Sequence, residues 1–198
     1  MRKASKMLGL MSSYPLLAVA CVSMVACSAK PSDSYAPEET VGSVRTYQVE
    51  LRAPGRELVR FTRTYRTEGT QRIGDQLYYR VSTEESIDAQ SKRFHYRRQD
   101  DFGIWIRSDD SPNSPEHRTL QFPLVEGATW PFGANGLSYV VGGREPVSLA
   151  NRTYPDCIKV TMLDSDGAPM TTSHFCRGVG SVFHMSGSTE NGATETLL

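Results

Sequence analysis

Short runs of alternating apolar and polar residues recur from about residue 43 onward, and turn-forming residues separate them. Such alternation is typical of strands that bury one face. No window keeps the 3.6-residue period of a helix for three turns. The chain is therefore expected to be mainly β, with a single curved antiparallel sheet that forms a half-barrel or a barrel-like shape. Strands are predicted over residues 45–51, 57–66, 76–82, 93–98 and 104–107, with turns at 54–55 and 67–74 and a helical turn at 86–91.

The segment CIKVTMLDSDGAPMTTSHFC, from Cys157 to Cys176, specifies its own strand pairing. If Asp166 and Gly167 are the two central residues of a type I′ turn, the two cysteines stand directly opposite each other. Opposed residues of an antiparallel pair have Cα atoms about 4.5–5.5 Å apart, a spacing that a disulfide accepts. We therefore predict a Cys157–Cys176 disulfide. Its role is expected to be structural, because the Cys-x-x-Cys spacing of redox sites is missing.

The N-terminus has the features of a secretory signal. Positive charges occupy residues 1–6, and residues 7–26 are apolar with few interruptions. A retained membrane span is an alternative, which Pro15 and several serines weaken. The sequence Met24-Val-Ala-Cys27 resembles the bacterial lipobox, in which cleavage leaves a cysteine that carries a diacylglyceryl group. An ordinary cleavage site before Cys21 competes, but cleavage before Cys27 leaves a polar N-terminus, and we favour Cys27 as the lipidation site.

Cleavage before Cys27 divides the chain into three parts: a signal peptide (1–26), a flexible tether (27–42) and a β-rich globular domain (43–198). The tether is rich in Ser, Pro and acidic residues, as linkers are. Several acyl chains on one residue would hold the protein firmly to a bilayer. Ser28 stands where an aspartate would resemble an inner-membrane retention signal. We therefore expect an outer-membrane protein that faces the periplasm, an oxidising compartment that supports disulfides.

The sequence predicts no catalytic, cofactor-binding or metal-binding residue. Ser181 and His184 are three residues apart, a spacing that points to opposite faces of a strand. The start of a calcium loop is visible at residues 164–167, but the late bidentate glutamate is missing. The histidines never reach a zinc spacing; they are His95, His117, His174 and His184. A formal net charge of zero gives no long-range field for nucleic acid, so no nucleic-acid partner is expected.

Three motifs follow one another in the second half of the chain. They are Pro123-Leu-x-x-Gly-x-x-Trp130, Asp156-Cys-x-Lys-Val160 and Gly178-Val-Gly-x-Val182. In this order they resemble a pattern found in uncharacterised bacterial lipoproteins and secreted domains of unknown function. The resemblance covers roughly residues 122–183. It implies a curved antiparallel sheet and no assigned activity.

Three classes of function are compatible with these features, and an enzyme is the least favoured of them because no catalytic motif is found. The first is a non-enzymatic envelope lipoprotein whose sheet binds a protein partner or supports an envelope assembly. The alternative is a carrier or chaperone for a lipid or a lipoprotein, because curled sheets often hold ligands. The alternative requires an apolar cavity within the half-barrel.

Overall fold

The computed structural model describes residues 34–36, 39–133, 135–150 and 152–198. Within these residues twelve strands form one antiparallel sheet, and no helix occurs. The strands are β1 (Val44–Arg52), β2 (Val59–Ile73), β3 (Gln76–Glu85), β4 (Asp88–Asp100), β5 (Gly103–Arg107), β6 (His117–Gln121), β7 (Thr129–Phe132), β8 (Leu137–Leu149), β9 (Arg152–Leu163), β10 (Pro169–Cys176), β11 (Gly180–Gly187) and β12 (Gly192–Leu197).

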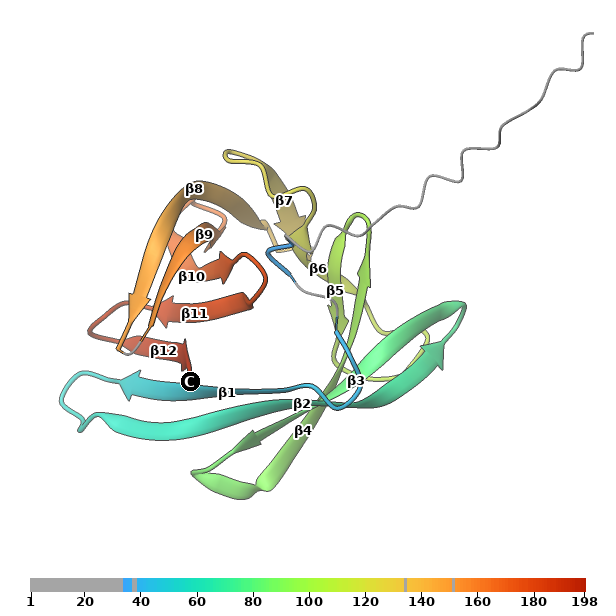
Figure 1. The fold of residues 1–198 in the computed structure, drawn as a ribbon, viewed down its shortest axis with the longest axis horizontal. Coiled ribbons are helices and arrows are strands. Elements are labelled where there is room, and N and C mark those ends of the chain that lie inside the picture. Colours follow the sequence, from blue (N-terminus) through green and yellow to red (C-terminus); the bar gives the residue numbers. More distant parts are fainter. Residues whose placement is uncertain (1–33, 37–38, 134, 151) are drawn as a thin grey trace, which may run out of the picture. The chain divides into compact units, whose positions relative to one another are not determined.

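The sheet curls into a nearly closed, barrel-like shape (Figure 1), which confirms the predicted fold class. Strands that follow each other in sequence pair with each other, except β6 and β7, and β12 returns to pair with β1. The order β6-β5-β4-β3-β2-β1-β12-β11-β10-β9-β8-β7 leaves β6 and β7 as the two edges. Both edges are short, and Pro131 lies in β7, as an edge strand permits. The indole nitrogen of Trp130 on β7 spans the gap and donates to the Arg118 carbonyl oxygen on β6 at 3.2 Å.

Two segments that were expected outside the sheet belong to strands. The polar run over residues 67–74 continues β2 as far as Ile73, so that the predicted turn there is wrong. The reversal uses only Gly74 and Asp75, since Ile73 pairs with Gln76. The predicted helical turn at residues 86–91 is also wrong, because Glu85 pairs with Asp88 and β4 begins there. In both places a largely polar strand belongs to the sheet because its neighbours supply the backbone hydrogen bonds.

The β9–β10 hairpin has the predicted register but a different turn. Residues 157–162 pair with residues 171–176 as predicted, and a disulfide joins Cys157 to Cys176. The amide of Gly167 donates to the Asp164 carbonyl oxygen at 3.1 Å, so residues 165 and 166 are central, and Gly167 follows them at a φ of 82°. The longer loop shifts the pairing by one residue, and an irregularity between Pro169 and Thr171 restores it.

Apolar side chains are buried on both faces of the sheet. Cys157 and Ile158 are neighbours in β9 and point to opposite faces, yet each is at most 1% exposed. Ile158 belongs to a cluster with Trp130 and Val141, whereas the disulfide packs with Tyr154 and Val182. The neighbours Val81 (5% exposed) and Ser82 (0%) in β3 show the same two-sided burial, whereas at the start of this strand Tyr78 is buried (3%) and Leu77 is exposed (54%).

The end of the expected tether is part of the folded domain. Residues 34–36 and 39–43, here called the N-terminal strap, lie against several strands. The Ser34 carbonyl oxygen accepts from the Gly178 amide at 2.9 Å, and the Ala36 carbonyl oxygen accepts from Gln99 Nε2 at 3.1 Å. Ala36 is only 2% exposed. The C-terminal part of the expected tether (27–42) therefore belongs to the folded domain. Residues 1–33, which include Cys27, lie outside the described residues.

Candidate functional site

The sheet encloses a cavity of about 350 Å³. Cavities of this size hold small molecules in many proteins. On both sides of the gap between the edge strands, β5, β6, β9 and β10 contribute apolar side chains: Ile104, Ile106, Leu120, Val160 and Phe175. Farther round the sheet, β1, β2, β4, β10 and β11 contribute polar side chains: Arg45, Thr67, His95, Arg97, Ser173 and His184. The lining is therefore mixed, unlike the apolar cavity that the carrier alternative requires.

Glu39 of the strap is the acidic centre of the polar lining. Its Oε1 accepts hydrogen bonds from Thr67 Oγ1 at 2.5 Å and from Ser43 Oγ at 2.6 Å. Its Oε2 lies 2.7 Å from Arg97 Nη1. Burial raises the pKa of the Glu39 carboxyl, but Arg97 and the two hydroxyls outweigh it and the pKa is lowered. Glu39 is therefore an ionised, almost fully buried group (6% exposed).

Arg97, the partner of Glu39 in this ion pair, also lines the cavity. Its side chain is 19% exposed, and its Nε is buried without a hydrogen-bond partner among the described residues. Arg45 on β1 also lines the cavity and interacts electrostatically with both Glu39 and Arg97. Burial lowers the pKa of Arg97, but a guanidinium starts so far above neutrality that it stays charged.

A row of three side chains crosses β10, β11 and β12 on the cavity side. Ser173 pairs with His184, and His184 pairs with Glu195. Ser173 Oγ and His184 Nδ1 are 2.8 Å apart, while Glu195 contacts Arg63 Nη1 and accepts from the Tyr65 hydroxyl at 3.3 Å. Burial is the main cause that lowers the pKa of His184, so the imidazole is neutral at pH 7.

Ser181 and His184 lie on the same face of the sheet, and the expectation from their spacing is wrong. Three residues apart on a regular strand, they were expected on opposite faces, but both line the cavity. The register of β10 and β11 shifts between His174 and Phe175, because Ser181 pairs with Phe175 and Phe183 pairs with His174. This bulge adds one residue to β11 and brings the two side chains to the same face. The hydroxyl that contacts His184 is nevertheless that of Ser173.

The other histidines are dispersed. His95 lines the cavity, and burial and the nearby Arg97 lower its pKa. His117 packs against Phe132 at 5.2 Å between ring centroids, and His174 Nε2 lies 2.7 Å from Glu145 Oε1. In the part of the chain that the structure describes, no group of three His, Cys, Asp or Glu side chains could hold a metal ion. Nor does a helix that could cross a membrane occur there.

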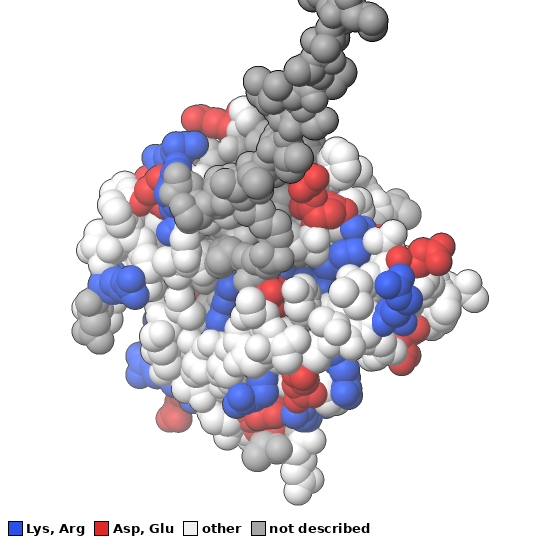
Figure 2. All heavy atoms as spheres, turned by 45° about the vertical axis from the view of Figure 1, so that its right-hand side comes forward, with Lys and Arg blue, Asp and Glu red and all other residues white. Residues whose placement is uncertain are grey.

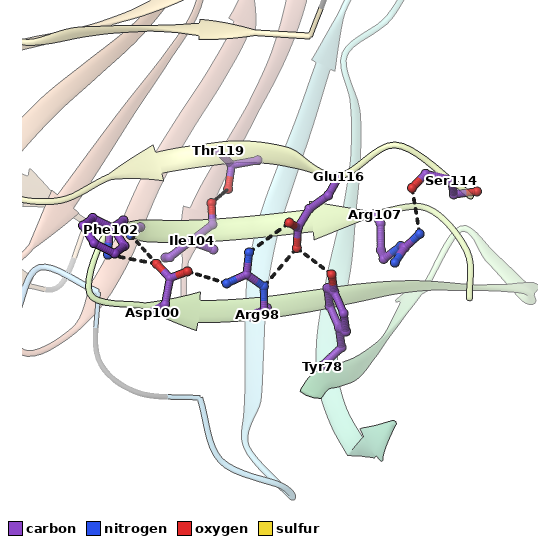
Figure 3. A network of polar contacts seen from close by, with 10 residues as sticks. Tyr78, Arg98, Asp100, Phe102, Ile104, Arg107, Ser114, Glu116 and Thr119 are labelled. Carbon is purple, nitrogen blue, oxygen red and sulfur yellow. Dashed lines mark hydrogen bonds and ion pairs between the residues drawn. The ribbon is translucent and has the colours of Figure 1, made fainter. Parts of the chain in front are cut away.

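A second polar network lies at β3, β4 and the loop before β6 (Figure 3). Arg98 binds Glu116 through two nitrogens, with Nη2 to Oε2 at 2.9 Å and Nε to Oε1 at 3.1 Å. The Tyr78 hydroxyl donates to the same carboxylate at 2.7 Å, and Arg98 Nη1 also contacts Asp100. Because each partner is bound from several sides, the network attaches the loop to the sheet rather than forming an open site.

The surface carries charges of both signs. On the face in Figure 2, basic and acidic side chains are interspersed among uncharged ones. This distribution fits the formal net charge of zero. Such a face lacks the strong field of one sign that would attract a highly charged partner over a distance.

Comparison with known proteins gives no family. No family model and no curated protein matches the chain. Among solved structures, an exported protein of Bacteroides fragilis with a YmcC-like fold is similar over 83% of this chain and 97% of its own, with 12% identity and a TM-score of 0.49. A protein of Parabacteroides distasonis assigned to the lipoproteins is similar over the same shares, with 10% identity and a TM-score of 0.43. Because the identities and TM-scores are this low, the function of this chain is argued from its own residues.

Proposed function

We propose that the chain is an exported envelope lipoprotein, anchored through Cys27, whose folded domain is a non-enzymatic module that binds a small ligand. The observation that carries the binding role is the cavity of about 350 Å³, because polar groups that are costly to bury line it. A protein that needed only a stable interior would fill this space with apolar side chains. The motif resemblance of residues 122–183 to uncharacterised lipoproteins agrees with the proposal.

Export is supported from two directions. The N-terminus has a charged start, an apolar run and small residues before Cys27. The domain contains a buried disulfide, Cys157–Cys176, and disulfides persist in oxidising compartments such as the periplasm. If Cys27 is the first mature residue, Ser34 follows it after six residues, and this stretch spans at most about 25 Å. The strap would then hold the domain close to the bilayer, which we propose is the outer membrane, facing the periplasm.

The polar row on β10 to β12 favours binding over hydrolysis. A serine hydrolase needs a base that a third group orients, and donors that stabilise an oxyanion. Ser173 and His184 supply a hydroxyl and a neutral imidazole, but Glu195 is engaged by Arg63 and Tyr65. The same groups can donate and accept hydrogen bonds to a bound molecule.

The apolar part of the cavity lining favours the carrier alternative. The apolar residues of β5, β6 and β10 form a continuous side of the cavity near the gap between the edge strands. A purely apolar lipid would leave the charged side unsatisfied, and this is costly. A carrier function would therefore require a ligand with both an apolar part and a polar group.

The anchor is tested by the intact mass and the membrane fractionation of the protein expressed in a Gram-negative bacterium. We expect a mature chain that starts at Cys27, carries the mass of its acyl chains and sediments with the outer membrane. Cys27→Ala should abolish the lipid mass and the membrane association, whereas the matched change Cys21→Ala should leave both intact. A soluble wild-type chain without lipid, or lipid that Cys21→Ala removes, would refute anchoring through Cys27.

A further inference from the structure

We infer that the cavity binds a small amphipathic anion, with its acidic group at Arg45 and Arg97 and its apolar part against β5, β6 and β10. This inference rests on the proposed binding function and names the class of ligand. The charge balance, the hydrogen-bonding capacity of Arg97 and the arrangement of the lining carry it independently of one another.

The charge balance of the cavity favours an anion. Arg45 and Arg97 supply two positive charges, and Glu39 supplies one negative charge to this side. The carboxylate of Glu195 does not offset the second arginine, because Arg63 binds it. His95 and His184 contribute no charge at pH 7, since burial lowers the pKa of each. Among the described residues, one positive charge therefore remains without a counter-charge in a partly enclosed space, where electrostatic interactions are stronger than in water.

Arg97 has unused hydrogen-bonding capacity. One Nη of its guanidinium binds Glu39, but its buried Nε has no partner among the described residues. A buried donor without an acceptor is costly, and a guanidinium presents its donors in a planar fork that fits a carboxylate or phosphate. The Arg97 side chain is 19% exposed and lines the cavity, so an anionic ligand there can accept from the part of the guanidinium that Glu39 leaves free. Arg45 is half-buried and lines the same cavity, so it can contact the same ligand.

The apolar surface begins directly beside Arg97. In the β4–β5 ladder Arg97 pairs with Ile106, and paired residues point to the same face of the sheet. Ile104, Leu120 and Phe175 continue the apolar lining across the gap between the edge strands. A molecule with its acid at the arginines would therefore place an apolar group against these side chains. A fully polar anion would leave that side of the cavity in contact with water.

Three ring compounds of similar shape test the inference: benzoate, benzyl alcohol and benzylammonium. Dissociation constants are measured by ligand-observed NMR on the full lipidated chain in a neutral detergent, with acetate and inorganic phosphate as anions without an apolar group. We expect benzoate to bind most tightly and benzylammonium most weakly. Arg45→Gln should weaken benzoate binding about tenfold or more, as loss of a charged hydrogen bond does. The exposed Arg66→Gln serves as the matched control and should change nothing.

Several results would overturn the inference. They are equal binding of benzoate and benzylammonium, equal effects of Arg45→Gln and Arg66→Gln, and binding of phosphate or acetate as tight as that of benzoate. The last would indicate a site for a free inorganic or polar anion. Thermal unfolding of Arg45→Gln establishes that the variant is folded. If benzyl alcohol bound while the anions did not, the anionic ligand would be refuted but the proposed binding function would remain. A failure of the proposed anchor would instead be seen in the intact mass and the membrane fractionation of the wild type and Cys27→Ala.

Discussion

Replacement of Glu39 by alanine is expected to lower the free energy of unfolding by about 3–5 kcal/mol, because it leaves the buried Arg97 without its counter-charge. Glu39 also accepts from Ser43 and Thr67, so the strap loses these side-chain contacts in the same step, while the backbone hydrogen bonds of Gly42 and Ser43 to Thr67 on β2 remain. The loss is measured by urea unfolding at pH 7. The exposed Glu57→Ala is the matched control and should cost less than about 0.5 kcal/mol.

A double variant separates the effect of the unpaired Arg97 charge on stability from the effect of the lost Glu39 side-chain volume. If the unpaired charge of Arg97 dominates, Glu39→Met combined with Arg97→Met should be clearly more stable than Glu39→Met alone, because the pair is replaced by apolar groups. A double variant that is less stable than the single one would contradict this explanation. A loss below about 1 kcal/mol in Glu39→Ala would show that the strap is not packed as described.

The same pair predicts how stability depends on pH. The pKa of Glu39 is lower in the folded protein than its ordinary value of 4.5. The unfolded chain therefore binds the proton more tightly, and the contribution of Glu39 to stability is fully present above about pH 4.5 and is lost as the pH falls through the lowered pKa. Glu39→Gln should accordingly show a shallower loss of stability under acid conditions than the wild type. Parallel curves would contradict the prediction.

Loss of the Cys157–Cys176 disulfide is expected to cost about 3 kcal/mol, the value that the chain-entropy account gives for a loop of this length. Cys157→Ala, Cys176→Ala and the double variant should lose similar amounts, since each removes the same bond. Because the cross-link keeps the unfolded chain compact, the urea dependence of the unfolding free energy should become steeper in all three. Urea unfolding of the exported protein under non-reducing conditions measures both quantities.

A substitution that shortens a buried side chain without removing a bond controls for packing. Val160→Ala, in the same strand and 2% exposed, should lower stability but leave the urea dependence unchanged. If the cysteine variants behaved like Val160→Ala, or if thiol labelling found both wild-type cysteines free, the bond would not contribute as described.

The sequence predicted the sheet because its signals are local. Alternation in β1 and the Asp-Gly turn of the β9–β10 hairpin require only neighbouring residues, and the opposed cysteines followed from them. The predicted register of the cysteines is correct although the predicted turn type is not, because the irregularity near Met170 offsets the extra loop residue. The return of β12 to β1, which nearly closes the sheet, joins residues far apart in the sequence and could not be predicted from local pattern.

The polar lining of the cavity was not predicted, because arginine is usually exposed. Arg45 alternates with Tyr47, and Arg97 alternates with His95, so each arginine shares its face with a side chain that lines the cavity. Their inward position was visible in the alternation but ran against the usual exposure of arginine. Glu39 was missed for another reason: a Pro- and Ser-rich stretch has the composition of a linker, and only the folded sheet provides Arg97 and Thr67 as its partners.

The central claim is that the domain contains a polar cavity that small molecules can enter, and a single introduced thiol tests it most directly. With Cys27 lipidated and Cys157 bonded to Cys176, Ser173→Cys would carry the only free thiol of the mature chain. Its modification by small anionic and cationic methanethiosulfonate reagents is followed by mass spectrometry, beside the exposed Ser148→Cys. We predict that Cys at position 173 reacts more slowly than at 148 and prefers the anionic reagent. No modification at 173 after 148 has reacted completely would contradict the claim.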